Sequence, residues 1–236
     1  MQTKQNEIPA NEQGFFNLMS LAITALVALP VGIACLVLGF GLGDNPCVMC
    51  WAERITMIAI SLIALFIIRY GLKPSYLAAL LLMACWGIFN GFIHYSLDGT
   101  FGGYLDIKQG FGLEILGAHT QFWVMVVDFC VIIFLALIFL FSKNLGLIMQ
   151  KSSNGEYGNF LSYLPLGKFA NLVFIVIILA NCVQAFIASG PPPYLGSSTP
   201  PRMSIDPSKW FWEKDHWESS LDFRFDWNPE LPDLAK

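Results

Sequence analysis

Residues 122–141 read FWVMVVDFCVIIFLALIFLF, an uninterrupted apolar run in which Asp128 is the only charged side chain. A helix that crosses the hydrocarbon core of a bilayer needs about 20 such residues, because its backbone must satisfy its own hydrogen bonds where water is absent. The run has both the length and the composition that this requires. It therefore predicts a membrane-spanning helix.

Four further apolar segments have the same character. The chain is 56% hydrophobic and only 13% charged, with a mean hydropathy of +0.59, which is far too apolar for a soluble domain of this length. The segment after Cys50 reaches spanning length only if its helix begins near that cysteine. The first segment is longer than the apolar region of a signal peptide, which has about 7–15 residues. The four segments are residues 18–42, 55–68, 76–93 and 169–188.

The five segments predict an all-α membrane protein: a four-helix transmembrane bundle, a fifth transmembrane helix and an extended polar C-terminal tail. Basic residues in short loops stay on the cytoplasmic side of a membrane. They occur before the first span, between the second and third, and between the fourth and fifth. We therefore expect residues 1–17 to be a cytoplasmic arm, 18–142 the bundle, 143–168 a cytoplasmic loop, 169–189 the fifth helix and 190–236 an acidic, tryptophan-rich outer tail.

Two of the six cysteines, Cys47 and Cys50, lie outside the uninterrupted apolar runs, where an outer loop meets the second span. The other four fall within spans, where a thiol behaves as a small buried hydrophobe. The predicted orientation puts the pair on the outer, oxidising side, where disulfides persist. The pair is therefore either a structural bridge or a working redox couple.

The spacing of this pair suits redox chemistry. Cysteines two residues apart at a helix N-terminus can form a small disulfide ring, and the free N–H groups of that terminus favour a thiolate. Glu53 and Arg54 follow Cys50 by three and four positions, so they share its helix face. A planar guanidinium at the membrane edge can hydrogen-bond a quinone carbonyl or stabilise the reduced anion.

Other interpretations of the same residues stay open. A CxxC pair is also half of a zinc site or a structural bridge, and Glu53 and Arg54 can pair with each other as an interfacial anchor. Cys47, Met49 and Cys50 are soft ligands suited to copper(I). The alternative functions are therefore a copper(I)-binding protein and a non-catalytic assembly subunit of a membrane complex.

The run Pro46-Cys47-x-x-Cys50-x-x-Glu53-Arg54 at the start of the second span resembles the disulfide bond formation protein B family. The order of loops and spans over residues 18–141 is also similar to that family, including a third span that ends in a histidine. The family is a four-helix quinone reductase of the bacterial inner (cytoplasmic) membrane. It reoxidises a thioredoxin-like dithiol oxidase of the periplasm.

The resemblance implies a membrane thiol:quinone oxidoreductase whose cofactor is ubiquinone or menaquinone. It implies that Cys50 is the cysteine nearest the quinone and that Cys47 exchanges with incoming thiols. Arg54 would hold the quinone head group and Glu53 would orient that arginine. His94 would lie near the quinone ring, where it could pass a proton. The N-terminus would be cytoplasmic and the tail periplasmic.

One departure from the family concerns the second cysteine pair that its members usually carry in the longer outer loop. Residues 95–121 contain no cysteine, and neither does the chain after Cys182. We therefore expect a periplasmic thioredoxin-like or other dithiol protein to meet Cys47 directly or to supply the missing pair.

Three polar residues near the fourth span are further candidates. Asp128 lies deep in an apolar run, where an acid is either functional, here on a proton path, or a protonated hydrogen-bonding group. His119 and Gln121 precede the same run and are candidates for the mouth of the quinone site or for interfacial anchors. We predict no metal site. The net charge of −4 and the lack of a basic patch argue against a nucleic-acid partner, which leaves membrane lipid, quinone and a dithiol protein.

Overall fold

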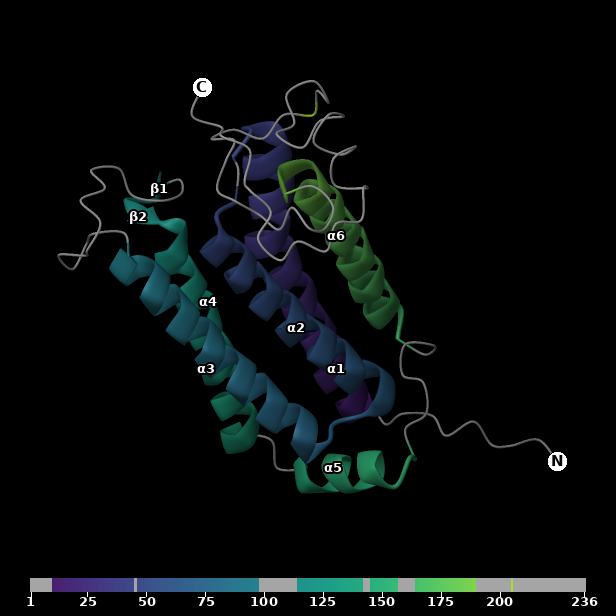
Figure 1. Cartoon of the computed structure of the whole chain (residues 1–236). Coiled ribbons are helices and arrows are strands. Elements are labelled where there is room, and N and C mark those ends of the chain that lie inside the picture. Colours follow the sequence, from purple (N-terminus) through teal and green to yellow (C-terminus); the bar gives the residue numbers. More distant parts are fainter. Residues whose placement is uncertain are drawn as a thin grey trace, which may run out of the picture.

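The fold is given by a computed structural model, which describes residues 10–44, 46–97, 114–141, 145–156, 164–189 and 205. Within those residues, five helices are long and apolar enough to cross a membrane, and they run side by side (Figure 1). All five sequence-predicted spans are confirmed, and the chain is an all-α, multi-pass membrane protein. The spanning segments are Glu12–Gly41, Met49–Tyr70, Pro74–Ser96, Thr120–Leu140 and Pro165–Ala188.

The first span is one long helix of two kinds. α1 (Ala10–Leu26) continues without a break into η1 (Val27–Gly41), which is wound as a π-helix. Pro30 lies inside η1, where it lacks the N–H that the regular pattern needs. Because π-helical segments are frequent at functional sites, the residues that face η1 are candidates for a functional role.

The remaining helices pack around α2 (Val48–Tyr70), which contacts α1, η1, α3 (Pro74–Leu97) and α6 (Pro165–Ser189). α4 (Thr120–Phe141) packs mainly on α3. α6 packs on α1 and η1, so it covers the side of α2 that lies away from α3 and α4 (Figure 1). The fifth spanning helix is therefore part of the bundle.

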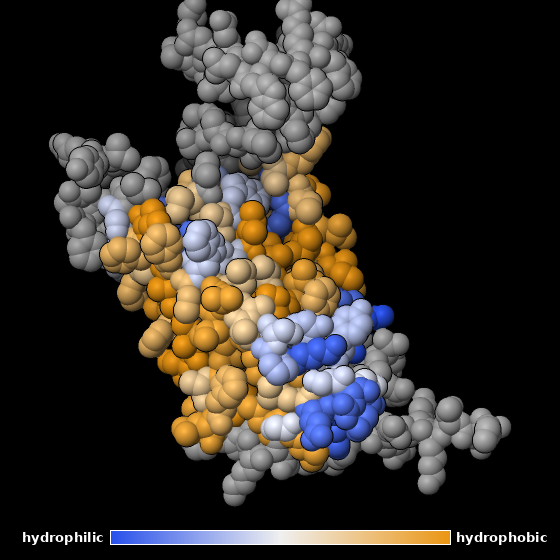
Figure 2. All heavy atoms as spheres, turned by 60° about the horizontal axis from the view of Figure 1, so that its bottom comes forward, coloured by the Kyte–Doolittle hydropathy of each residue, from blue (hydrophilic) through white to orange (hydrophobic). Residues whose placement is uncertain are grey.

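Much of the interior of the bundle is apolar, and so is much of its outside. One buried cluster joins α1 to α6 along the end of the bundle away from the cysteine pair, and a smaller one joins Val27, Val31, Met57 and Ile177. Figure 2 shows hydrophobic side chains over most of the coloured surface, with a hydrophilic patch toward the end that comes forward in that view. This is the distribution expected where lipid, and not water, surrounds the helices.

Two short elements connect the spans. α5 (Leu145–Ser153) is a helix that the sequence analysis does not predict; it lies at one end of the bundle, buries Ile148 and pairs Lys151 with Glu12 at 3.1 Å. A hairpin of β1 (Glu114–Ile115) and β2 (Ala118–His119) leads into α4. Its two-residue turn places Gly117 at a φ of 78°, a conformation that glycine adopts without strain.

Some sequence predictions fall outside the described residues. They concern residues 1–9 of the N-terminal arm, residues 98–113 of the longer outer loop, and the tail from residue 190 onward except Ile205. The domain boundaries and the sidedness of the chain stay predictions.

Candidate active site

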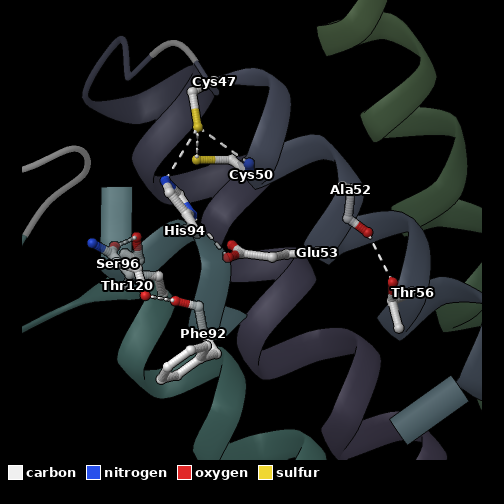
Figure 3. Close-up of polar contacts among 10 residues, drawn as sticks. Cys47, Cys50, Ala52, Glu53, Thr56, Phe92, His94, Ser96 and Thr120 are labelled. Atoms are coloured by element: carbon white, nitrogen blue, oxygen red, sulfur yellow. Dashed lines mark hydrogen bonds and ion pairs between the residues drawn. The ribbon is translucent and has the colours of Figure 1, made fainter. Parts of the chain in front are cut away.

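The two cysteines of the CxxC motif meet at the N-terminus of α2. Cys47 caps the helix, because its Sγ accepts a hydrogen bond from the backbone N–H of Cys50 at 3.2 Å. The two Sγ atoms lie 2.9 Å apart and both thiols are free (Figure 3). The pair is therefore a dithiol that can close into a disulfide with little movement of the chain.

His94 links this dithiol to a buried carboxylate. Its Nε2 lies 3.5 Å from Cys47 Sγ, and its Nδ1 lies 2.8 Å from Glu53 Oε1 (Figure 3). His94 is 1% exposed and Glu53 3% exposed, so water does not weaken the contact between these two side chains. Sulfur, imidazole and carboxylate form a chain along which a proton can move from Cys47 toward Glu53.

The surroundings of Cys47 lower the pKa of its thiol to about 4, against an ordinary value of 9.0. The largest cause is the hydrogen bond from the Cys50 thiol. The hydrogen bond and the positive charge of His94 add to it, and together they outweigh burial, which acts in the opposite direction. Cys47 is thus a thiolate at neutral pH when the pair is reduced. A thiolate of low pKa is a good leaving group in disulfide exchange.

Arg54 points away from this chain of residues, toward η1 and α6. Its Nη1 donates to Gln184 Oε1 at 2.6 Å and more weakly to Asn181 Oδ1 at 3.5 Å. Its Nη2 donates to the backbone oxygen of Ala34 at 3.0 Å. The guanidinium also lies over the Trp51 ring, 5.2 Å from the ring centroid. Although it is only 7% exposed, its charge is well hydrogen-bonded.

Glu53 has a different partner from the one expected. The resemblance suggested that it orients Arg54, but its hydrogen bond goes to His94, and the described partners of Arg54 lie on η1 and α6. Adjacent residues on a helix point about 100° apart, so the two side chains reach hydrogen-bond partners on different helices.

A cavity of about 200 Å³ lies beside the dithiol, between η1 and α4. A second cavity of about 350 Å³ is lined almost wholly by apolar residues and shares Leu29, Pro30 and Val127 with the first. Polar groups at one end and a continuous apolar wall beyond them fit a quinone head group with an isoprenoid tail. The polar or sulfur-bearing groups that line the first cavity include Asp44, Cys47, Cys50, Glu53 and Arg54.

Asp44 is a further member of this site. It lies in the loop between η1 and α2 and lines the first cavity. Burial raises the pKa of its carboxyl, and the nearby charge of Arg54 opposes that rise. An acid with a raised pKa next to the cavity is placed to hold a proton there.

The other predicted site residues lie near the cavity but do not line it. His94 stands behind Cys47, and His119 and Gln121 flank Thr120, which does line the cavity. Asp128 is fully buried, and neither of its carboxylate oxygens has a hydrogen-bond partner among the described residues. A Cβ on Gly87 of α3 would overlap this carboxyl, so the glycine leaves the room that Asp128 fills.

The dithiol and His94 could also hold a metal ion. The ligand atoms of Cys47, Cys50 and His94 lie within 4.8 Å of one another. Two thiolates and one imidazole are a set that binds zinc with a fourth position open. In this set His94 is the third ligand.

The family model for disulfide bond formation protein DsbB matches residues 16–185. That match spans more than half of the chain and contains the dithiol, His94 and both α6 amides. The chain belongs to the DsbB family. No curated protein and no solved structure matches it. Membership of the DsbB family assigns an oxidoreductase function in disulfide-bond formation, and the match runs into α6, beyond residues 18–141 on which the resemblance rested.

The sequence analysis missed the two amide side chains of α6, although the sequence of this DsbB-family protein carries a signal for them. Asn181 and Gln184 are three residues apart within the run 169–188. They therefore share one face of the helix. Amides in a membrane span are used to hydrogen-bond across helices, so this pair indicated a polar partner on another span.

Proposed function

We propose that this DsbB-family protein is a membrane thiol:quinone oxidoreductase, which oxidises periplasmic dithiols through a Cys47–Cys50 disulfide and passes the electrons to ubiquinone or menaquinone. One observation carries the proposal. The dithiol lies between a proton-accepting chain, His94 and Glu53, and a cavity lined by Arg54. Thiol oxidation needs an acceptor for protons and one for electrons, and the His94–Glu53 pair and the cavity beside Arg54 provide for both.

In the first half-reaction a thiolate of the partner attacks Sγ of Cys47. The Cys47–Cys50 bond breaks, and Cys50 leaves with the electron pair. The partner's second thiolate then attacks its own sulfur in the mixed disulfide and releases Cys47. The partner loses two electrons and the Cys47–Cys50 pair gains them. The lowered pKa of Cys47 favours its departure as a thiolate.

In the second half-reaction the dithiol returns to the disulfide. A bound quinone supplies the acceptor, taking up two electrons and two protons. Cys50 lines the cavity and is the cysteine that faces it from α2, while Cys47 also contacts His94. Arg54 hydrogen-bonds a carbonyl oxygen and stabilises negative charge there. His94, hydrogen-bonded to Glu53, receives or returns a proton at Nε2.

The proposed partner is a periplasmic thioredoxin-like or other dithiol protein. The chain has no cysteine in the longer outer loop or after Cys182, so the partner's thiols must reach Cys47 directly or arrive through a pair on another protein. We further propose that the chain lies in the bacterial inner membrane, with its N-terminus cytoplasmic and its tail periplasmic. Reporter fusions at the two termini test that orientation.

Purified protein in detergent tests the activity. We expect it to reduce a water-soluble quinone when a reduced thioredoxin-like protein is supplied, with the quinone absorbance as the readout. Cys50→Ser should stop this turnover. Cys182→Ser is the matched control, because that thiol lies on α6 and is exposed, away from the dithiol. Turnover retained in Cys50→Ser, or absent in the unaltered protein, would contradict the proposal.

Copper(I) binding is the alternative that a specific observation favours, namely the three soft or borderline ligands Cys47, Cys50 and His94 within reach of one ion. Metal analysis after purification under reducing conditions separates the two functions. A copper protein would carry about one copper per chain and lose it in His94→Gln, whereas the oxidoreductase should turn over quinone without it.

A further inference from the structure

The shortest hydrogen bond of Arg54 among the described residues is made with the fifth spanning helix. Gln184 Oε1 lies 2.6 Å from Nη1, and Gln184 is 0% exposed. The contact joins residues 130 positions apart in the chain, so only the packing of α6 against α2 and η1 brings it about. Because an amide oxygen is neutral, it can fix the guanidinium without cancelling its charge.

Two glycines of η1 make room for this contact. A Cβ on Gly39 would overlap the amide of Gln184, and a Cβ on Gly32 would lie 2.6 Å from Cδ1 of Ile177. Gly32 and Gly39 are seven residues apart, and so are Ile177 and Gln184. The two helices thus run parallel with a matched repeat, and small residues let them approach closely as they do in other membrane bundles.

The contact between η1 and α6 also confines the Gln184 side chain. On one side Gly39 leaves just enough space for the amide, and on the other side Arg54 takes its oxygen. Arg54 is held at a second point by the backbone oxygen of Ala34, which also belongs to η1. The position of the guanidinium at the cavity is therefore set jointly by η1 and α6.

We propose that α6 is an integral part of the quinone-reducing site, and that Gln184 is the positioning residue that holds the Arg54 guanidinium toward the cavity. The inference rests on the proposed function, in which Arg54 contacts the quinone. It assigns a role in quinone binding to a helix that lies outside the four-helix unit expected from the sequence. Gln184 does not line the cavity, so it acts through Arg54.

The two half-reactions separate positioning from a general structural role. Gln184→Met keeps the size of the side chain and removes the acceptor. We expect it to raise the KM for a short-chain quinone about tenfold. The rate at which a dithiol protein reduces the Cys47–Cys50 disulfide in the absence of quinone should stay unchanged, because that step does not involve Arg54. A general loss of structure would slow both half-reactions.

A binding measurement supplies a readout other than turnover. In a Cys50→Ser background, which cannot turn over, a short-chain quinone should raise the melting temperature, because its binding free energy adds to the stability of the folded protein. Gln184→Met should weaken that stabilisation about tenfold in apparent Kd. Ile177→Ala is the control at the same contact between η1 and α6. It loosens the packing against Gly32 and should lower the melting temperature without changing the quinone Kd.

Arg54→Gln distinguishes failure of this inference from failure of the proposed function. If Arg54→Gln weakens quinone binding and Gln184→Met does not, the positioning role of α6 is overturned while the quinone site at Arg54 stands. If neither variant changes quinone binding, both the positioning role of Gln184 and the quinone site at Arg54 are wrong. Should Gln184→Met yield no folded protein, Gly39→Ala displaces the same amide, and an unchanged quinone KM in that variant would equally overturn the inference.

Discussion

The Glu53 carboxylate accepts a hydrogen bond from Nδ1 of His94 at 2.8 Å, and both side chains are buried. A carboxylate can only accept, so the proton on this ring belongs at Nδ1. Nε2 is then the atom that faces Cys47 Sγ. The pair therefore holds the imidazole in the orientation that lets it take a proton from the thiol or stabilise the thiolate as an imidazolium.

The pH dependence of Cys47 alkylation tests this arrangement. With a pKa lowered to about 4, the Cys47 thiol of the reduced protein is deprotonated above that pH, so iodoacetamide should react at a constant rate from pH 5 to 7 and more slowly near pH 4. His94→Leu removes one cause of the lowered pKa, so the midpoint should rise toward the ordinary thiol value of 9.0. Ser96→Ala on the same helix is the control. An unchanged midpoint in His94→Leu would show that His94 does not lower the pKa of the Cys47 thiol.

A matched pair of substitutions at position 50 tests the largest cause of that lowered pKa. Cys50 donates a hydrogen bond to the Cys47 thiolate, and serine retains a donor whereas alanine does not. We expect Cys50→Ala to raise the alkylation midpoint of Cys47 more than Cys50→Ser does. Equal midpoints in the two variants would show that the hydrogen bond contributes little.

The order of events at the dithiol predicts which variant traps the partner. With Cys50→Ser, a disulfide of the oxidised partner can exchange with Cys47, but no second thiol of this chain resolves the product. We expect a mixed disulfide through Cys47, seen as a heavier band on a non-reducing gel that reductant removes. Cys47→Ser should yield none. A stable adduct in Cys47→Ser would reverse the roles of the two cysteines.

The sequence predicted the spans and the dithiol but not the contacts between spans. Apolar length alone decides whether a helix can cross a bilayer, so all five spans were accessible without the fold. The neighbours Glu53 and Arg54 were expected to act together, because they are adjacent in sequence and stand together in the motif on which the resemblance rested. Their partners His94 and Gln184 are 41 and 130 positions away, and only helix packing shows which face of α2 meets which helix.

The contact between Gly87 and Asp128 predicts an interaction that a double-mutant cycle can measure. Gly87→Ala places a methyl group where the Asp128 carboxyl lies, so it should destabilise the protein by about 1–3 kcal/mol. Asp128→Ala in the same chain removes the overlap and should recover most of that loss. Melting temperatures in detergent provide the measurement. Additive effects of Gly87→Ala and Asp128→Ala would refute the contact. Gly146→Ala is the control glycine substitution. No atom lies within 4 Å of its added Cβ, so it should stabilise helix α5 by about 0.5–1 kcal/mol.

The two cavities meet at Val127, which lines both. If the first holds a quinone head group and the second its isoprenoid tail, a larger side chain at this junction should exclude the tail more than the head. We expect Val127→Phe to raise the KM for a long-chain quinone about tenfold and to change that for a tail-less quinone little. Val126→Phe is the control, since Val126 lines neither cavity. An equal rise for both quinones would contradict this arrangement, because it would show that the added ring acts on the head group and not on a tail that passes Val127.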